Sequence, residues 1–140
     1  MNPTMKKFGY PDTLVTEYKH WVVLLKPKQT TVSTLVLVAK SGATQLGQLT
    51  ADEWAEFALV CNETEAKLST TFRPDKFNYL ALMMKDPNVH FHLVPRYSQP
   101  VNINGNSYSD TDWPLATKMG ELEISTGDMK AIKRKLLNET

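Results

Sequence analysis

Runs of apolar residues separated by polar breaks predict two strands in the first third of the chain. Residues 21–25 (WVVLL) and 34–39 (TLVLVA) are rich in Val and Leu, which favours buried strands. A polar segment, residues 26–29, interrupts the first run, and Ser41 and Gly42 end the second. We expect the two strands to pair as a hairpin-like unit.

Two more strands are expected in the second half. Residues 78–84 and 89–95 are mostly apolar, and residues 85–88 (KDPN) form a turn-like join between them. Because that join is short, it favours an antiparallel pair. The joins resemble hairpins rather than crossover units, so the pattern predicts an α+β fold with an antiparallel sheet.

Helix signals lie between and after these strands. Thr50 with Glu53 three residues later is typical of a capping box at a helix start, and Ser125 with Asp128 resembles a second start. The first helix has a stripe that we expect to pack in the core: Trp54, Phe57, Ala58, Cys61 and Leu68. The second is expected to be amphipathic, with an apolar face of Met129, Ile132 and Leu136. Its basic run is expected to be solvated: Lys130, Lys133, Arg134 and Lys135.

The remaining segments are expected to be irregular. Residues 1–15 are predicted to form a loose arm with Pro3 and Pro11 as breakers, and residues 98–112 a polar loop. At 140 residues the chain predicts one domain, 1–140, in which residues 98–140 are a C-terminal loop and helix extension.

Composition narrows the class of protein. A net charge of +1 gives no strong electrostatic case for binding nucleic acid or a membrane. No apolar run approaches the ~20 residues of a membrane span, and the start of the chain does not resemble a secretion signal. The single cysteine, Cys61, cannot form an internal disulfide, which fits a reducing compartment. We therefore expect a cytoplasmic protein.

The candidate chemistry is concentrated in the last predicted strand. His90 and His92 are two of three histidines in the chain, and their spacing puts both on one face of a strand. Val89, Phe91 and Leu93 then point to the other face. Imidazole has an unperturbed pKa of roughly 6.5, so a rigid strand that carries two of them suggests chemistry.

Three interpretations of this pair remain open from spacing alone. The histidines could be metal ligands, but no acidic residue follows until Asp110 to complete a site. They could be buried and hydrogen bonded without chemistry. They could also attack and stabilise a phosphate ester or anhydride, since neutral imidazole is a nucleophile toward phosphorus. Arg96 shares their face only if the strand continues through Pro95.

A resemblance separates these interpretations. Residues 86–97 (DPNVHFHLVPRY) resemble the signature of the histidine triad (HIT) superfamily, in which three histidines alternate with apolar residues and Pro-Arg-Tyr often follows. The upstream features also occur in the order found in HIT domains: the strand at 21–25, the second strand, the helix start at 49–54 and Asn78 just before the motif. The likeness spans roughly residues 15–100.

The resemblance implies a fold, a reaction and site residues. HIT domains have a five-stranded antiparallel sheet with helices packed on it, and they usually form homodimers. The middle histidine, which corresponds to His90, attacks the α-phosphorus of a nucleotide, and the last, His92, contacts the phosphate or bridging oxygen. A nucleotidyl-histidine intermediate is then hydrolysed or passed to an acceptor. The family requires no metal as a structural ligand, although some members act on magnesium-bound substrates.

This chain departs from the family pattern at two places. Asn88 replaces the first histidine and keeps a donor and an acceptor without a titratable charge. Before the second strand, residues 33–35 (STL) replace the usual Gly-His or Gly-Arg, and Lys28 or Lys40 would have to supply the charge.

Other residues are candidates for the nucleotide pocket. Besides Asn88, the substrate-binding candidates are Asn78, Lys85 and Arg96. Trp113 either closes one side of a nucleotide or dimer groove or simply packs. The sequence therefore predicts a hydrolase or nucleotidyltransferase acting on phosphoanhydrides or phosphoramidates, similar to dinucleoside polyphosphate hydrolases. The alternative is a non-catalytic nucleotide-binding protein on the same fold.

Overall fold

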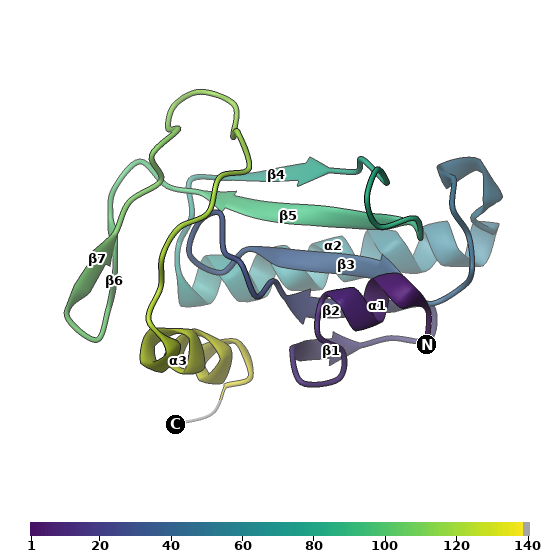
Figure 1. Cartoon of the computed structure of the whole chain (residues 1–140), viewed down its shortest axis with the longest axis horizontal. Coiled ribbons are helices and arrows are strands. Elements are labelled where there is room, and N and C mark those ends of the chain that lie inside the picture. The colour runs from purple at the N-terminus through teal and green to yellow at the C-terminus, as the bar shows by residue number, and fades with distance from the viewer. Residues whose placement is uncertain (139–140) are drawn as a thin grey trace.

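Five antiparallel strands form the central sheet of this protein, in the order β1-β2-β3-β5-β4 (Figure 1). The structure is a computed structural model that describes residues 1–138. The strands are β1 (Leu14–Glu17), β2 (Trp21–Leu25), β3 (Leu35–Ala39), β4 (Lys76–Leu80) and β5 (His90–Arg96). The α+β class and the antiparallel sheet predicted from the sequence are confirmed.

The centre of the sheet is apolar on both faces. Every residue of β2 and β3 is buried, and the two strands pair from Trp21 opposite Ala39 to Leu25 opposite Leu35. β3 also pairs with β5, and β5 with β4. Strands that are covered on both faces need apolar side chains at every position, and the runs of Val and Leu provide them. The hairpin predicted for the first two apolar runs and the antiparallel pair of the last two are both confirmed.

Helices cover the two faces of the sheet unequally. α2 (Ala51–Thr71) lies behind the sheet in Figure 1, and the short α1 (Pro3–Lys7) lies in front of it. The larger apolar core includes side chains from α2 and from α3 (Thr126–Leu136). A smaller core joins Met5 and Phe8 to the front-facing valines and leucines of β2 and β3. The front face is the one that carries His90 and His92.

The start of α2 was predicted correctly, and its apolar stripe was predicted correctly in part: Phe57, Cys61 and Leu68 pack in the main core. Thr50 and Glu53 form the capping box through reciprocal hydrogen bonds of 3.1 and 2.9 Å. Trp54, however, is 38% exposed, and Ala58 is also exposed. The buried residues are Glu53, Val60, Thr64 and Leu68. The prediction was wrong for Trp54 and Ala58, because two polar residues, Glu53 and Thr64, occupy inward positions on this helix.

The N-terminal arm is not loose, contrary to the prediction. Pro3 begins α1 instead of breaking the structure, since a proline at the first helical position loses no internal hydrogen bond. Asn2 caps the helix by accepting a hydrogen bond from the Met5 amide at 2.9 Å. Met5 and Phe8 are buried against the sheet. The strand β1, which the sequence analysis missed, follows directly.

Residues 81–89 connect β4 to β5, so the third strand is shorter than the predicted range 78–84. The expected polar loop at 98–112 contains a second, two-stranded sheet of β6 (Val101–Ile103) and β7 (Asn106–Tyr108). Its turn holds Asn104 and Gly105 at φ 51° and 85°, a left-handed pair that makes a tight hairpin. This short Asn-Gly signal was present in the sequence but was overlooked among polar residues.

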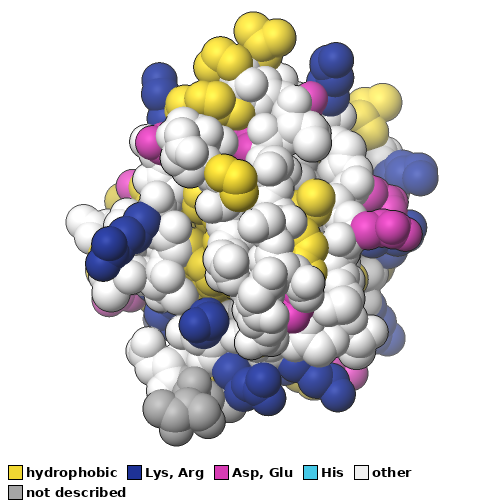
Figure 2. Space-filling model, turned by 90° about the vertical axis from the view of Figure 1, so that its left-hand side faces the viewer, with side chains coloured by type: hydrophobic (Ala, Val, Ile, Leu, Met, Phe, Trp, Pro, Cys, Tyr) yellow, Lys and Arg dark blue, Asp and Glu magenta, His cyan; other side chains and the backbone are white. Residues whose placement is uncertain are grey.

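The C-terminal helix matches its prediction. Ser125 accepts a hydrogen bond from the Asp128 amide at 3.1 Å, and Ile132 and Leu136 are fully buried. Lys and Arg side chains gather at the lower end of the face in Figure 2, where α3 lies, in keeping with a solvated basic side. Residues 139 and 140 of the expected extension lie outside the described part. Within residues 1–138, no helix is long and apolar enough to cross a membrane.

Candidate functional site

The two histidines of β5 face the front of the sheet, as the alternation predicted. His92 lies opposite Val36 and His90 opposite Val38, both of which belong to the front core. Leu93 and Phe91 belong to the core on the helix side. β5 also continues through Pro95 to Arg96, so Arg96 shares the histidine face. The strand therefore holds both imidazoles on a rigid, fully paired support.

A single hydrogen bond sets the orientation of His90. Its Nδ1 lies 2.7 Å from the backbone carbonyl oxygen of Asn88. A carbonyl oxygen only accepts, so Nδ1 must carry the proton, and in the neutral ring the lone pair is then on Nε2. The geometry leaves Nε2 as the nucleophilic atom of the ring.

His92 lies beside His90 in a different environment. The two ring centres are 5.1 Å apart and nearly perpendicular. Burial, followed by the positive charge of a protonated His90 and of Lys26, lowers the pKa of His92 to about 4. His92 is therefore neutral at neutral pH. Its Nδ1 is buried without a hydrogen-bond partner, so an unsatisfied polar atom lies next to His90.

Phe8, which follows α1, covers both imidazoles. The Phe8 ring centre lies 5.6 Å from that of His90 and 5.7 Å from that of His92. His90 is only 3% exposed and His92 only 9%. The sequence analysis did not include Phe8 in the site, because a residue 82 positions away in an expected loose arm gave no signal. Phe8 therefore helps to shield both imidazoles from solvent.

Asn88, two residues before His90, is held by Thr4 of α1. The Thr4 hydroxyl donates to the amide oxygen of Asn88 at 3.0 Å and accepts from the Asn88 backbone N–H at 3.1 Å. The Thr4 N–H also points to that amide oxygen at 3.4 Å. The oxygen of the Asn88 side chain is thus engaged within the protein, and only its NH₂ group is left for a substrate.

Arg96 and Asn78 belong to a separate network further along the sheet. Arg96 donates to both carboxylate oxygens of Asp110, at 2.7 and 3.2 Å, to Asn78 Oδ1 at 2.8 Å and to a backbone carbonyl at 2.8 Å. Burial raises the pKa of Asp110, but hydrogen bonds from Arg96 and the Tyr97 amide outweigh it and hold that pKa below its usual value. By strand rise, Arg96 is about 13 Å from His92. The structure therefore does not bring Arg96 to the imidazoles.

A cavity of about 550 Å³ opens beside this network. Asn78, Leu80 and Arg96 line it together with Trp113 and Leu115. Because Leu80 pairs with His92, and paired residues share a face, the cavity lies on the histidine side of the sheet. The expected role of Trp113 at a groove is consistent with this position.

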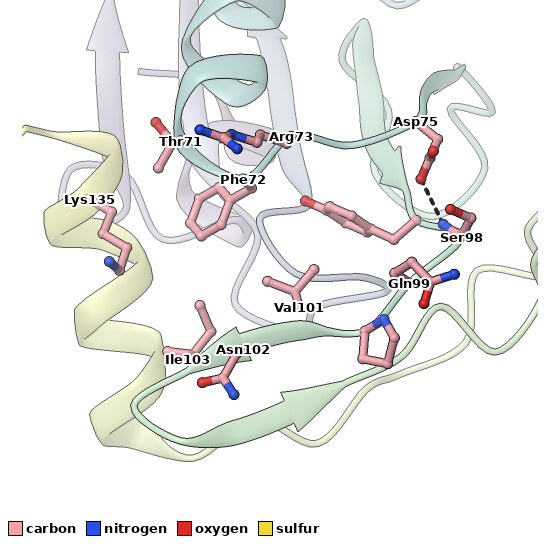
Figure 3. Close-up of a pocket in the computed structure, with 12 residues that line it drawn as sticks. Thr71, Phe72, Arg73, Asp75, Ser98, Gln99, Val101, Asn102, Ile103 and Lys135 are labelled. Atoms are coloured by element: carbon pink, nitrogen blue, oxygen red, sulfur yellow. Dashed lines mark hydrogen bonds between the residues drawn. The ribbon is translucent and has the colours of Figure 1, made fainter.

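A second hollow, of about 390 Å³, lies elsewhere. It is formed where the end of α2, the segment after β5 and α3 meet, and Arg73, Lys135 and Asp75 point toward it (Figure 3). Asp75 accepts a hydrogen bond from the Ser98 amide at 2.7 Å. Neither cavity is lined by His90 or His92. The hollow in Figure 3 thus stands apart from the histidine site.

The positive charge near the histidines comes from an unexpected lysine. Lys28 pairs with Glu121 at 3.5 Å and Lys40 with Glu17 at 2.9 Å, so both candidate replacements for the missing basic residue have acidic partners. Lys26 continues the face of β2 toward His92 and contributes to the low pKa of His92. Lys85 is exposed in the connection between β4 and β5.

Among residues 1–138, no group of three or more His, Cys, Asp or Glu side chains is placed to hold a metal ion. The arrangement that the chain does offer is an oriented imidazole, a second neutral imidazole and a nearby ammonium. Such a set can attack an electrophilic phosphorus and bind its oxygens.

Comparisons with known proteins identify the family and the fold. The family model of the HIT domain matches residues 7–99. The structure is similar to a histidine triad protein from Marinobacter aquaeolei VT8 (22% identity, 89% of this chain and 88% of that one, TM-score 0.70). It is also similar to a histidine triad protein from Sinorhizobium meliloti 1021 (16% identity, 100% and 96%, TM-score 0.75). A third similar structure is a diadenosine triphosphate hydrolase from Plasmodium falciparum (14% identity, 91% and 76%, TM-score 0.65). A search of curated proteins finds no match.

Proposed function

We propose that this chain, which belongs to the HIT domain family, is a nucleotide phosphoanhydride or phosphoramidate hydrolase or nucleotidyltransferase, with His90 as its nucleophile. The family includes nucleotide hydrolases, and one structural neighbour is a diadenosine triphosphate hydrolase. The single observation that carries the proposal is the hydrogen bond between His90 Nδ1 and the Asn88 carbonyl at 2.7 Å. It supports a ring whose Nε2 presents a lone pair.

The proposed reaction has two displacements at one phosphorus. His90 Nε2 forms a bond to the α-phosphorus while the bond to the leaving oxygen or nitrogen breaks, and that atom retains the electron pair. The proton on Nδ1 stays hydrogen bonded to Asn88, so the ring carries a positive charge next to the transferred phosphoryl group. Water, phosphate or another acceptor then attacks the phosphorus and releases His90.

The remaining candidates have roles around this centre. His92, neutral and with an unpartnered Nδ1, contacts a phosphate or bridging oxygen, and Lys26 supplies positive charge. The cavity beside Asn78 and Arg96 accepts the more distant part of the substrate, with the amide NH₂ group of Asn78 as a donor, and the NH₂ group of Asn88 donates near His90. Lys85 is exposed on the connection that precedes β5 and contacts the outer phosphates.

Turnover by matched variants tests the proposal. The protein is incubated with diadenosine polyphosphates and with an amine adenylate, with and without Mg²⁺, because the magnesium would enter with the substrate. His90→Ala should lower turnover by about 10³-fold or more, the usual cost of removing a covalent nucleophile. Lys130→Ala, an exposed change on α3, is the control and should turn over as the wild type does. Equal turnover by His90→Ala and wild type would remove the nucleophile assignment.

A second candidate function is nucleotide binding without catalysis. The observation that favours it is Asn88 in place of the first triad histidine, with its amide oxygen engaged by Thr4. Calorimetry that shows nucleotide binding, with no turnover over hours, would support this alternative. Asn88→His separates the two functions further: a large gain in rate means a weakened enzyme. An unchanged rate means either that Asn88 is sufficient or that the site does not catalyse.

A further inference from the structure

We infer that Thr4, in the first turn of α1, is a positioning residue for the nucleophile and acts through Asn88. The inference rests on the proposed function only in that it takes His90 as the nucleophile. It gives the N-terminal segment, which lies outside the strand that carries the histidines, a direct part in the site.

The contact between Thr4 and Asn88 engages residue 88 at two points. One hydroxyl accepts from the backbone N–H of Asn88 and donates to its side-chain oxygen, at 3.1 and 3.0 Å. The Thr4 amide adds a longer contact of 3.4 Å to the same oxygen. Backbone and side chain of residue 88 are thus fixed together by a residue 84 positions away.

The fixed residue is the one that orients His90. The carbonyl oxygen of Asn88 accepts from His90 Nδ1 at 2.7 Å. Thr4 is 0% exposed, Asn88 6% and His90 3%, so water does not substitute readily for any of these bonds. A change at Thr4 that frees residue 88 therefore loosens the acceptor that selects the Nδ1–H form of His90.

This link also gives a physical reason why asparagine is accommodated at position 88. Its amide oxygen accepts from both the hydroxyl and the N–H of Thr4, and an oxygen with two lone pairs suits two donors. A neutral imidazole offers a single acceptor nitrogen. The contact with Thr4 thus fixes the orientation of Asn88 next to the proposed nucleophile.

Two readouts test the inference, and the first does not depend on the proposed activity. The first is the ¹⁵N–¹H spectrum of the imidazoles at neutral to mildly alkaline pH, which reports whether Nδ1 or Nε2 of His90 carries the proton. The second is kcat and KM with a diadenosine polyphosphate. Three variants are compared with wild type: Thr4→Val removes the hydroxyl and keeps the shape, Thr4→Ser keeps the hydroxyl, and Thr31→Val is the control. Thr31 is equally buried, and its hydroxyl donates to the Pro95 carbonyl at 2.6 Å, away from Asn88.

Thr4→Val should shift the His90 imidazole signals toward a mixture of the two ring forms. It should also lower kcat about tenfold, because both hydrogen bonds between the hydroxyl and residue 88 are lost, with KM nearly unchanged. Thr4→Ser should keep the wild-type His90 spectrum and kcat. Thr31→Val should lower the free energy of unfolding but leave the His90 spectrum and kcat unchanged. If Thr4→Val does not fold, Thr4→Cys, which lacks the γ-methyl group and replaces the hydroxyl with a weak donor, takes its place.

An unchanged His90 spectrum in folded Thr4→Val or Thr4→Cys would overturn the inference and leave Thr4 a purely structural residue. A wild type without any turnover would defeat the proposed function, but the spectrum would still decide the role of Thr4. The two failures are therefore distinguishable.

Discussion

His92 connects burial at one residue to the pH dependence of the whole fold. Its pKa is lowered to about 4, chiefly by burial, whereas in an unfolded chain it is near the usual value of about 6.5. Above about pH 6.5 the ring is neutral in both the folded and the unfolded state, so proton binding to His92 does not change the free energy of unfolding. As the pH falls below that value, the unfolded chain takes up the proton first, and the folded state loses stability.

We therefore predict that part of the acid sensitivity of this protein resides in His92. Between about pH 7 and pH 4.5 the wild type should lose roughly 2 kcal/mol of its free energy of unfolding through this residue. His92→Gln should show a pH-dependent loss smaller by that amount, measured by urea unfolding at both pH values. Equal pH-dependent losses in the two proteins would contradict the prediction, whatever the variant's stability at neutral pH.

At the residue scale, the sequence predicted what alternation and motif determine. His90 and His92 share a face, and Phe91 and Leu93 point to the opposite core, because a strand has a period of two. Thr4 and Phe8 could not be predicted as site residues. Their contacts with the histidine strand depend on how a short helix crosses the sheet, and no local pattern records a contact over more than 80 residues.

At the scale of elements, α2 shows where periodicity misleads. The stripe predicted from Trp54 to Leu68 is only partly buried, since Glu53 and Thr64 occupy inward positions and Trp54 is 38% exposed. Trp54 packs on Phe57 at 6.0 Å, and Phe57 lies 6.5 Å from Tyr79 of β4. β4 is also an edge of the sheet. An exposed aromatic residue next to an open edge strand is a feature of a protein interface.

We predict that the chain forms a homodimer through the β4 edge and the adjacent side of α2. Trp54→Glu should raise the dimer dissociation constant by about 30-fold or more, as expected when a central aromatic residue of an interface is lost. The monomer should keep its fold because Trp54 is partly exposed. Leu46→Glu, at the same 38% exposure on a separate short helix, is the control. Sedimentation velocity measures both, and an unaltered dimer in Trp54→Glu would place the interface elsewhere.

At the scale of the molecule, the folding unit extends beyond the HIT domain match, which ends at residue 99. Ile103, Ile132 and Leu136 come from the segment that follows, and all three belong to the main core with at most 1% exposure. The same segment provides Asp110, whose carboxylate neutralises the buried Arg96 at 2.7 Å. The sequence predicted the last helix from its cap and its apolar face. It did not predict that the polar stretch before it would pack against the sheet and pair with Arg96, because Arg96 and Asp110 meet only in the folded chain.

We accordingly predict that residues 1–99 do not fold alone. Deleting residues 100–140 exposes the core beneath three buried side chains, each worth about 1.5–3 kcal/mol, and removes the carboxylate that pairs with Arg96. Together these losses equal the whole stability of a typical domain, about 5–15 kcal/mol. In the full chain, Ile132→Ala should cost about 2–5 kcal/mol, whereas Lys130→Ala on the exposed side of the same helix should stay within about 0.5 kcal/mol. Circular dichroism and urea unfolding measure all three proteins. A cooperative unfolding transition in the 1–99 fragment would contradict the prediction and show that residues 100–140 are not needed for folding.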